Sequence, residues 1–214
     1  MLLILLLSFG PGLLWLWFFY RQDARPEPGS LIGKTFLWGA FFVLPAILLE
    51  SLYSRYFASL PGLLAFYILN VLGIGLVEES AKLGAVWVAA WRKREFDEPM
   101  DGIIYAITAA LGFAALENLL YALRFGVGVV PARALITLLA HACFSGIAGE
   151  ALGRMRFGKA TFLSGLAIAS VLHGSYNFIL ASRLPQAWAV LLIIGSYLYL
   201  RRLIVRANGS GLRR

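Results

Sequence analysis

The sequence is short of charged residues and holds almost no cysteine. Only 14% of its 214 residues are charged and 60% are hydrophobic, whereas soluble domains are usually about 45 to 50% apolar. The one cysteine, Cys143, excludes an internal disulfide framework and a cysteine-rich metal knuckle. Together with a mean hydropathy of +0.79, these shortages exclude an ordinary soluble domain and indicate an integral membrane protein.

Familiar hydrolase signatures are missing as well. The chain contains no Gly-x-Ser-x-Gly, no His-Glu-x-x-His and no pair of aspartates inside an apolar run. Serine, zincin and aspartyl-protease mechanisms therefore have no specific support. No internal repeat is evident and no polar segment is long enough for a soluble domain, so we expect residues 1–214 to form a single membrane domain.

Seven apolar runs are long enough to cross a bilayer. The first lacks a basic leading segment and a small-residue cleavage site, so we expect a retained helix rather than a signal peptide. An open sheet could not satisfy its backbone in lipid. We therefore predict an all-α, polytopic membrane helix bundle with about seven transmembrane helices, near Leu2–Tyr20, Thr35–Leu52, Pro61–Trp91, Gly102–Leu123, Pro131–Leu152, Thr161–Leu180 and Gln186–Leu203.

Basic residues are distributed unevenly among the loops. The second, fourth and sixth loops hold Arg55, Arg124, Arg133 and Arg183. The other loops and the C-terminal tail hold many more: Arg21, Arg25, Lys34, Arg92, Lys93, Arg94, Arg154, Arg156, Lys159, Arg201, Arg202, Arg206, Arg213 and Arg214. Because basic loops favour the cytoplasmic side, we predict an N-terminus outside and a C-terminus in the cytoplasm. The net charge of +8 is thus a topology signal, and we expect the lipid bilayer, and no nucleic acid, as a partner.

The stretch at residues 70–84 places two carboxylates and a lysine inside an apolar run. Each charge at membrane depth costs roughly 2.5 to 3.5 kcal/mol on a mild scale, so Glu78, Glu79 and Lys82 must face protein or water. On a helix Glu78 and Lys82 can pair at i and i+4, while Glu79 points about 100° away and needs another partner. The cluster indicates a functional site, with a structural ion pair as the alternative.

Ionisable groups on four predicted helices share one depth. Each lies 13 to 16 residues from a charged residue of a predicted cytoplasmic loop, at Glu79, Glu117, His141 and His173. That spacing is roughly 20 to 24 Å along a helix, which indicates one polar layer. Glu50 and Glu150 fall near predicted helix ends instead, where we expect interfacial roles.

The polar layer contains the groups that peptide-bond hydrolysis needs. His141 shares a helix face with Ser145, His173 shares one with Asn177, and Asn118 follows a glutamate. A buried carboxylate can act as general base on a water, and histidine and amide donors can stabilise an oxyanion. We expect no cofactor, but zinc remains an alternative, with the ligands Glu79, Glu117, His141 and His173.

Four motifs in this order resemble the PrsW family of bacterial intramembrane proteases: Glu78-Glu-Ser-Ala-Lys82, Phe113-Ala-Ala-Leu-Glu117, His141-Ala-Cys-Phe-Ser145 and His173-Gly-Ser-Tyr-Asn177. The segment Phe96-Asp-Glu-Pro-Met-Asp-Gly-Ile-Ile-Tyr105 lies between the first two. That family is distantly similar to the CAAX prenyl endopeptidases and bacteriocin-immunity-type membrane proteins. The glutamate that ends the second motif favours the PrsW branch.

The resemblance implies a multi-pass protease of the bacterial cell membrane. Its substrate would be a single-span anti-sigma factor, whose site-1 cleavage leads to activation of an extracytoplasmic-function sigma factor. The residues implied most directly are Glu78, Glu79 and His173. The roles we predict are general base for Glu78 or Glu79, water-holding partners for Glu117 and His141, oxyanion donors for His173 and Asn177, charge balance for Lys82 and support for Asn118.

Three other functions remain open. A non-catalytic membrane scaffold would keep its function after Glu78 and Glu79 were replaced by Gln, whereas a protease would lose it. A proton- or ion-coupled transporter also uses intramembrane carboxylates and histidines, although repeated halves are not evident here. A CAAX-type prenyl-protein endopeptidase would require lipidated C-terminal peptides. Cleavage of an unlipidated single-span protein separates the protease we predict from a prenyl-protein endopeptidase.

Overall fold

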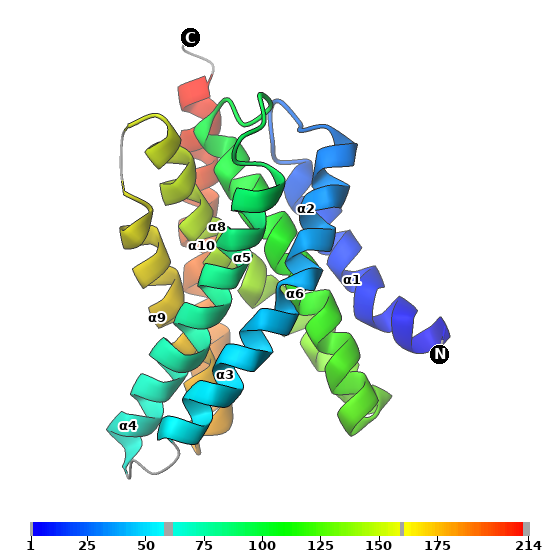
Figure 1. The fold of residues 1–214 in the computed structure, drawn as a ribbon, viewed down its shortest axis with the longest axis vertical. Helices are drawn as coiled ribbons and strands as arrows, with labels where there is room; N and C mark the ends of the chain where they lie inside the picture. Colours follow the sequence, from blue (N-terminus) through cyan, green and yellow to red (C-terminus); the bar gives the residue numbers. More distant parts are fainter. Residues whose placement is uncertain (1, 58–61, 159–160, 212–214) are drawn as a thin grey trace.

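The computed structural model describes residues 2–57, 62–158 and 161–211, and these are helical apart from short connections (Figure 1). Within these ranges, seven helical segments are long and apolar enough to cross a membrane: Leu2–Tyr20, Gly29–Arg55, Leu63–Ala89, Pro99–Phe125, Arg133–Arg156, Phe162–Ala181 and Ala187–Gly209. The predicted all-α bundle of seven spans is confirmed. The orientation of the termini stays a prediction, and three of its basic residues, Lys159, Arg213 and Arg214, lie outside the described residues, as does Pro61 at the predicted start of the third span.

Two long helices form the centre of the bundle, α6 (Pro99–Phe125) and α8 (Leu138–Arg156). Small residues let their backbones meet, because a Cβ added at Gly102 would lie 2.3 Å from the carbonyl oxygen of Gly149. The surrounding helices are α1 (Leu2–Tyr20), α2 (Gly29–Phe41), α9 (Phe162–Ala181) and α10 (Ala187–Gly211). Their outer faces carry many exposed leucines and tryptophans, as a surface in contact with lipid requires.

Three of the spans are interrupted rather than continuous. The second consists of α2 and α3 (Val43–Phe57), with a break at Phe42. Pro45, in the first turn of α3, has no N–H to continue the helical hydrogen bonds across this break. In the third span, α4 (Leu63–Ile68) leads through the π-helix η1 (Leu69–Gly75) into α5 (Leu76–Ala89). The fifth begins as the π-helix η3 (Arg133–Thr137) and continues as α8, and the short turns η2 (Val127–Val129) and α7 (Val130–Ala132) come just before it. Such π-turns are frequent at functional sites.

Two glycines bring α9 against η1. A Cβ added at Gly75 would lie 2.3 Å from the carbonyl oxygen of Ser170, and one at Gly174 would lie 2.4 Å from the Cα atom of Val71. The two backbones can therefore touch only because neither residue has a side chain. This contact carries His173 to the face of α5 that holds the acidic pair.

Candidate active site

Lys82 is the fully buried cation at the centre of the site. Its Nζ atom donates hydrogen bonds to Glu78 Oε2 at 3.0 Å and to Glu79 Oε1 at 2.8 Å. The predicted pair between Glu78 and Lys82 is confirmed. The expectation that Glu79 points away from Lys82 is wrong, because the long lysine side chain reaches both the i−3 and the i−4 carboxylate.

Both carboxylate oxygens of Glu79 are engaged inside the protein. Ser145 Oγ donates to Oε2 at 2.6 Å, and His173 Nδ1 lies 2.8 Å from Oε1. A carboxylate bound to one ring nitrogen fixes the orientation and tautomer of a histidine. Glu79 therefore positions the His173 ring rather than opening onto a cavity.

Glu78 faces both histidines of the protein. Its Oε2 atom lies 3.8 Å from His141 Nδ1 and 3.7 Å from His173 Nε2. The two imidazole rings meet edge to face with centroids 4.8 Å apart. One potential ligand atom from each of the three residues lies within 4.8 Å of the other two. Among the described residues, the buried Nδ1 atom of His141 has no hydrogen-bond partner.

Glu117 lies near His141 Nε2, whereas Glu78 lies near Nδ1 of the same ring. The Oε2 atom of Glu117 lies 3.5 Å from His141 Nε2, and its Oε1 atom lies 3.0 Å from the guanidinium of Arg133. Arg133 also donates from Nε to Asn118 Oδ1 at 2.8 Å and stacks over Tyr121, 3.8 Å from the ring centroid. From the sequence alone, Arg133 is expected to act with the loop residues as a topology signal. Its position at the start of a span, close to the predicted polar layer, was the clue to this second role.

Two adjoining cavities give access to the site. One, of about 330 Å³, lies between α3 and the second half of α6, two elements that diverge toward the bottom of Figure 1. The other, of about 360 Å³, extends past His141 and His173 to Asn177. Both cavities are lined by the carboxylates of Glu50, Glu78 and Glu117.

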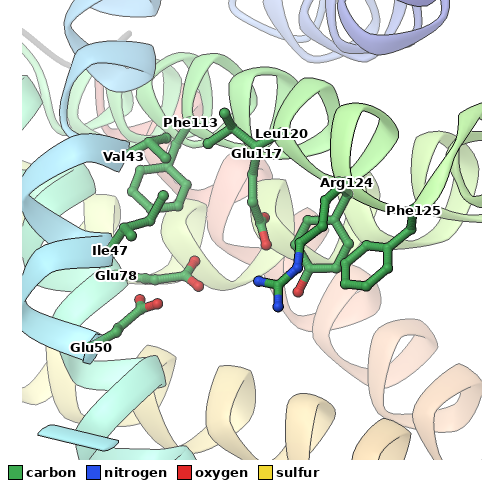
Figure 2. Close-up of a pocket in the computed structure, with 10 residues that line it drawn as sticks. Val43, Ile47, Glu50, Glu78, Phe113, Glu117, Leu120, Arg124 and Phe125 are labelled. Atoms are coloured by element: carbon green, nitrogen blue, oxygen red, sulfur yellow. The ribbon is translucent and has the colours of Figure 1, made fainter. Parts of the chain in front are cut away.

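Glu50 belongs to this site, which corrects the interfacial role expected from the sequence. Figure 2 shows its carboxylate beside that of Glu78, pointing into the cavity that Glu117 enters from α6. The predicted span ended at Leu52, but α3 runs on to Phe57, so Glu50 is well inside the helix. Glu150 does lie near a helix end, where it pairs with Arg154 at 3.6 Å.

The structure brings most of the predicted site residues together, and Asn177 lines the second cavity with His173. Two details differ from the sequence-based prediction. The first is Asn118, whose side chain accepts a hydrogen bond from Arg133. The metal ligands considered from the sequence included Glu79, whereas the carboxylate that converges with the two histidines is that of Glu78. The catalytic roles stay predictions.

These features define a class of protein: a multi-pass helical membrane protein with a buried carboxylate–histidine centre that is reached by a cavity between its helices. The family described as "PrsW family intramembrane metalloprotease" matches residues 27–203, and the chain belongs to this family. The resemblance seen in the motifs is thereby confirmed. Together with seven membrane-spanning helices, it makes the chain a multi-pass bacterial membrane protein.

Curated relatives cover most of this chain. Protease PrsW of Geobacillus kaustophilus is 35% identical over 81% of this chain and 77% of its own length. Protease PrsW of Bacillus subtilis is 32% identical over 85% of this chain and 84% of its own, and Protease PrsW of Clostridioides difficile is 32% identical over 78% and 74%. No solved structure matches the chain. The relatives' names support a peptidase activity.

Proposed function

We propose that the chain is an intramembrane peptidase that hydrolyses a peptide bond of a single-span membrane protein. One observation carries this proposal: Glu78 is 5% exposed, yet it lines a cavity between two membrane-spanning helices. A polar centre that is buried in the bundle but open between helices suits a substrate that is itself in the membrane.

The lining of that cavity supports a hydrophobic substrate segment. Its walls near α3 include Val43 and Ile47, and those on α6 include Leu120 and Phe125 (Figure 2). Binding sites usually combine such apolar walls with a few convergent polar groups. A transmembrane segment could pack against the apolar wall while a bond near its end meets Glu78 and Glu117.

The residues at the centre fit a divalent metal ion. Glu78, His141 and His173 would hold it, since their ligand atoms converge and the buried His141 Nδ1 lacks a partner among the residues described. In metal sites, a ligating histidine commonly donates its other ring N–H to a carboxylate, and the hydrogen bond between His173 and Glu79 has this arrangement. When bound, such an ion supplies Lewis-acid polarisation of a carbonyl and activation of water. We therefore prefer Glu78 to Glu79 as the metal-facing carboxylate.

Glu117 is the residue we assign to proton transfer. Its Oε2 atom is buried without a hydrogen-bond partner in the described part of the chain, and its side chain lines both cavities. In peptide hydrolysis a positioned carboxylate can take a proton from the attacking water and return it to the leaving amine. Arg133 would hold the Glu117 carboxylate in place through Oε1. Asn177, at the wall of the second cavity, would donate to the carbonyl oxygen.

The substrate we propose is a single-span anti-sigma factor cleaved at site 1, outside the cytoplasm. The motif resemblance and the family membership support this choice. The orientation predicted from the basic loops supports it as well, because it places the polar layer toward the outer half of the bilayer.

The experiment is co-expression of the chain with a panel of single-span proteins carrying tags on both sides of the membrane. The panel includes an unlipidated anti-sigma factor and a prenylated CAAX substrate. Each is tested with wild type, Glu78→Gln, Glu117→Gln and the matched control Glu150→Gln, whose residue pairs with Arg154 away from the cavities.

The proposal predicts cleavage of the unlipidated anti-sigma factor by wild type and Glu150→Gln, with loss in the other two variants. Mass spectrometry of the fragments then locates the cut. If only the prenylated substrate is cleaved, the proposed anti-sigma substrate is wrong and the chain acts as a CAAX-type endopeptidase. Cleavage that persists in Glu78→Gln would overturn the assignment of the site.

A further inference from the structure

A second group of buried carboxylates lies well away from the proposed active site. Asp23 and Glu27 belong to the connection between α1 and α2, and Asp101 belongs to the first turn of α6. Asp101 precedes Glu117 by 16 residues on one helix, a separation of roughly 24 Å. Asp23 and Glu27 are each 6% exposed and Asp101 is fully buried, and one oxygen from each lies within 4.8 Å of the others.

The hydrogen bonds of these carboxylates leave oxygens unused. Asp101 Oδ2 accepts from the backbone N–H groups of Asp97 and Glu98, both at 2.7 Å. Asp23 Oδ1 accepts from the backbone N–H of Arg25 at 2.9 Å. The remaining oxygens, Asp101 Oδ1 and Asp23 Oδ2, are buried and have no hydrogen-bond partner among the described residues.

Nearby groups hold this arrangement rigidly. The Tyr105 hydroxyl, from the second turn of α6, donates to Glu27 Oε2. Asn208 of α10 fixes the same connection, since its side chain donates to the carbonyl of Gln22 at 2.8 Å and accepts from the N–H of Ala24 at 3.3 Å. A group of acidic side chains that is fixed on two sides cannot relax by turning toward solvent.

The basic residue next to the cluster has a carboxylate partner of its own. The guanidinium of Arg25 forms an ion pair with Glu98, a fourth carboxylate at this end of α6. Buried carboxylates are normally paired or bound to a metal ion, because an uncompensated buried charge is costly.

We propose that Asp23, Glu27 and Asp101 bind a hard divalent cation of the Mg²⁺ type that fastens the α1–α2 connection to the start of α6. Carboxylate oxygens without sulfur or imidazole are the ligands that Mg²⁺ and Ca²⁺ prefer. Mg²⁺ is held by a few carboxylates and completes its octahedron with water. The donor set contrasts with Glu78, His141 and His173, whose two imidazoles favour zinc-like ions.

The experiment measures cation binding and needs no substrate, so its outcome is independent of the proposed peptidase activity. Mn²⁺ serves as the paramagnetic probe, titrated into the purified full chain in detergent and then displaced with Mg²⁺. The variants are Asp23→Asn and Asp101→Asn, each of which keeps an oxygen for its backbone hydrogen bonds. Asp97→Asn is the matched control, because Asp97 is an exposed aspartate beside the cluster.

Wild type and Asp97→Asn should each show one Mg²⁺-displaceable Mn²⁺ site, and Mg²⁺ should raise their melting temperature. In the two cluster variants the affinity of that site should fall roughly tenfold or more, since one charged ligand is lost. Any Mn²⁺ bound at the histidine centre should remain in these variants. The proposal fails if wild type has no Mg²⁺-displaceable site, or if Asp23→Asn binds as wild type does.

Gel filtration establishes that each variant is folded before binding is measured. If Asp101→Asn unfolds, Asp23→Asn still decides the matter, because Asp23 lies outside the helices. If both variants unfold, the wild-type displacement experiment and its melting temperature decide alone.

Discussion

His173 Nδ1 and Glu79 Oε1 lie 2.8 Å apart, although the two residues are 94 positions apart in the sequence. When Nδ1–H donates a hydrogen bond to this carboxylate, the neutral ring keeps a free lone pair on Nε2. That atom lies 3.7 Å from Glu78 Oε2. The carboxylate behind the histidine thus determines which nitrogen faces the cavity. The site thus contains two kinds of group: those that position another side chain, such as Glu79, and those that face the cavity, such as Glu78.

Replacing the buried lysine should destabilise the protein strongly. Lys82→Met leaves Glu78 and Glu79 without the cation that both contact, and breaking a buried ion pair by removing one partner costs about 3 to 5 kcal/mol. Arg154→Met, which removes the half-exposed partner of Glu150, should cost no more than about 1 kcal/mol. Thermal unfolding in detergent measures both. Equal effects of the two substitutions would contradict the central role of Lys82.

The close contact between α9 and η1 should be sensitive to a single methyl group. In Gly75→Ala the new Cβ would lie 2.3 Å from the carbonyl oxygen of Ser170, so α9 must shift and carry His173 with it. A displacement of about 1 Å at a catalytic group can reduce the rate about a hundredfold. Gly33→Ala is the matched control, because no atom lies within 4 Å of its added Cβ. Cleavage rates of the two variants should differ by that factor, and similar rates would argue against the contact.

Direct metal analysis should distinguish the three proposed metal ligands from Glu79, the carboxylate that supports one of them. We expect wild type to bind one zinc-like ion, and His141→Ala and His173→Ala to lose it, since each removes one of three converging ligands. A variant of the supporting carboxylate, Glu79→Gln, should retain the ion with affinity reduced about 10- to 100-fold. Dialysis against cobalt followed by absorption spectroscopy measures occupancy. Full occupancy in both histidine variants would exclude this ligand set.

Filling the cavity between α3 and α6 should hinder substrate access. Ile47 lines that cavity one turn before Glu50, so Ile47→Trp would narrow it while every charged residue of the site is kept. Leu48 is 61% exposed and absent from the cavity lining, which makes Leu48→Trp the control. We expect a higher KM for a membrane-embedded substrate in Ile47→Trp alone, with metal content unchanged. An unchanged KM would mean that the substrate takes another route.

The spacing of polar residues along the helices predicts their depth well but not their direction. It placed Glu79, Glu117, His141 and His173 in one layer, and all four meet at the site. It could not tell that Glu79 would be enclosed by Ser145 while its neighbour faces a cavity, because adjacent helical positions differ by rotation alone.

Glu50 and Arg133 are the two residues whose roles differ from those expected from the sequence. Glu50 was assigned to an interface because the predicted span stopped two residues later, whereas α3 continues to Phe57. Arg133 was counted with the loop residues although the predicted span Pro131–Leu152 contains it, and its pairing with Glu117 depends on how α6 packs beside η3. Tertiary packing sets such boundaries, and a hydropathy pattern does not contain it.

The most direct test of the account is cleavage of a single-span membrane substrate by the purified chain in liposomes. Wild type is compared with Glu78→Gln and with Glu150→Gln, each before and after treatment with a strong chelator and re-addition of zinc. The account predicts cleavage by wild type and Glu150→Gln that chelator abolishes and zinc restores, with none by Glu78→Gln. Cleavage by Glu78→Gln at the wild-type rate would contradict the claim that the Glu78, His141 and His173 centre performs the reaction.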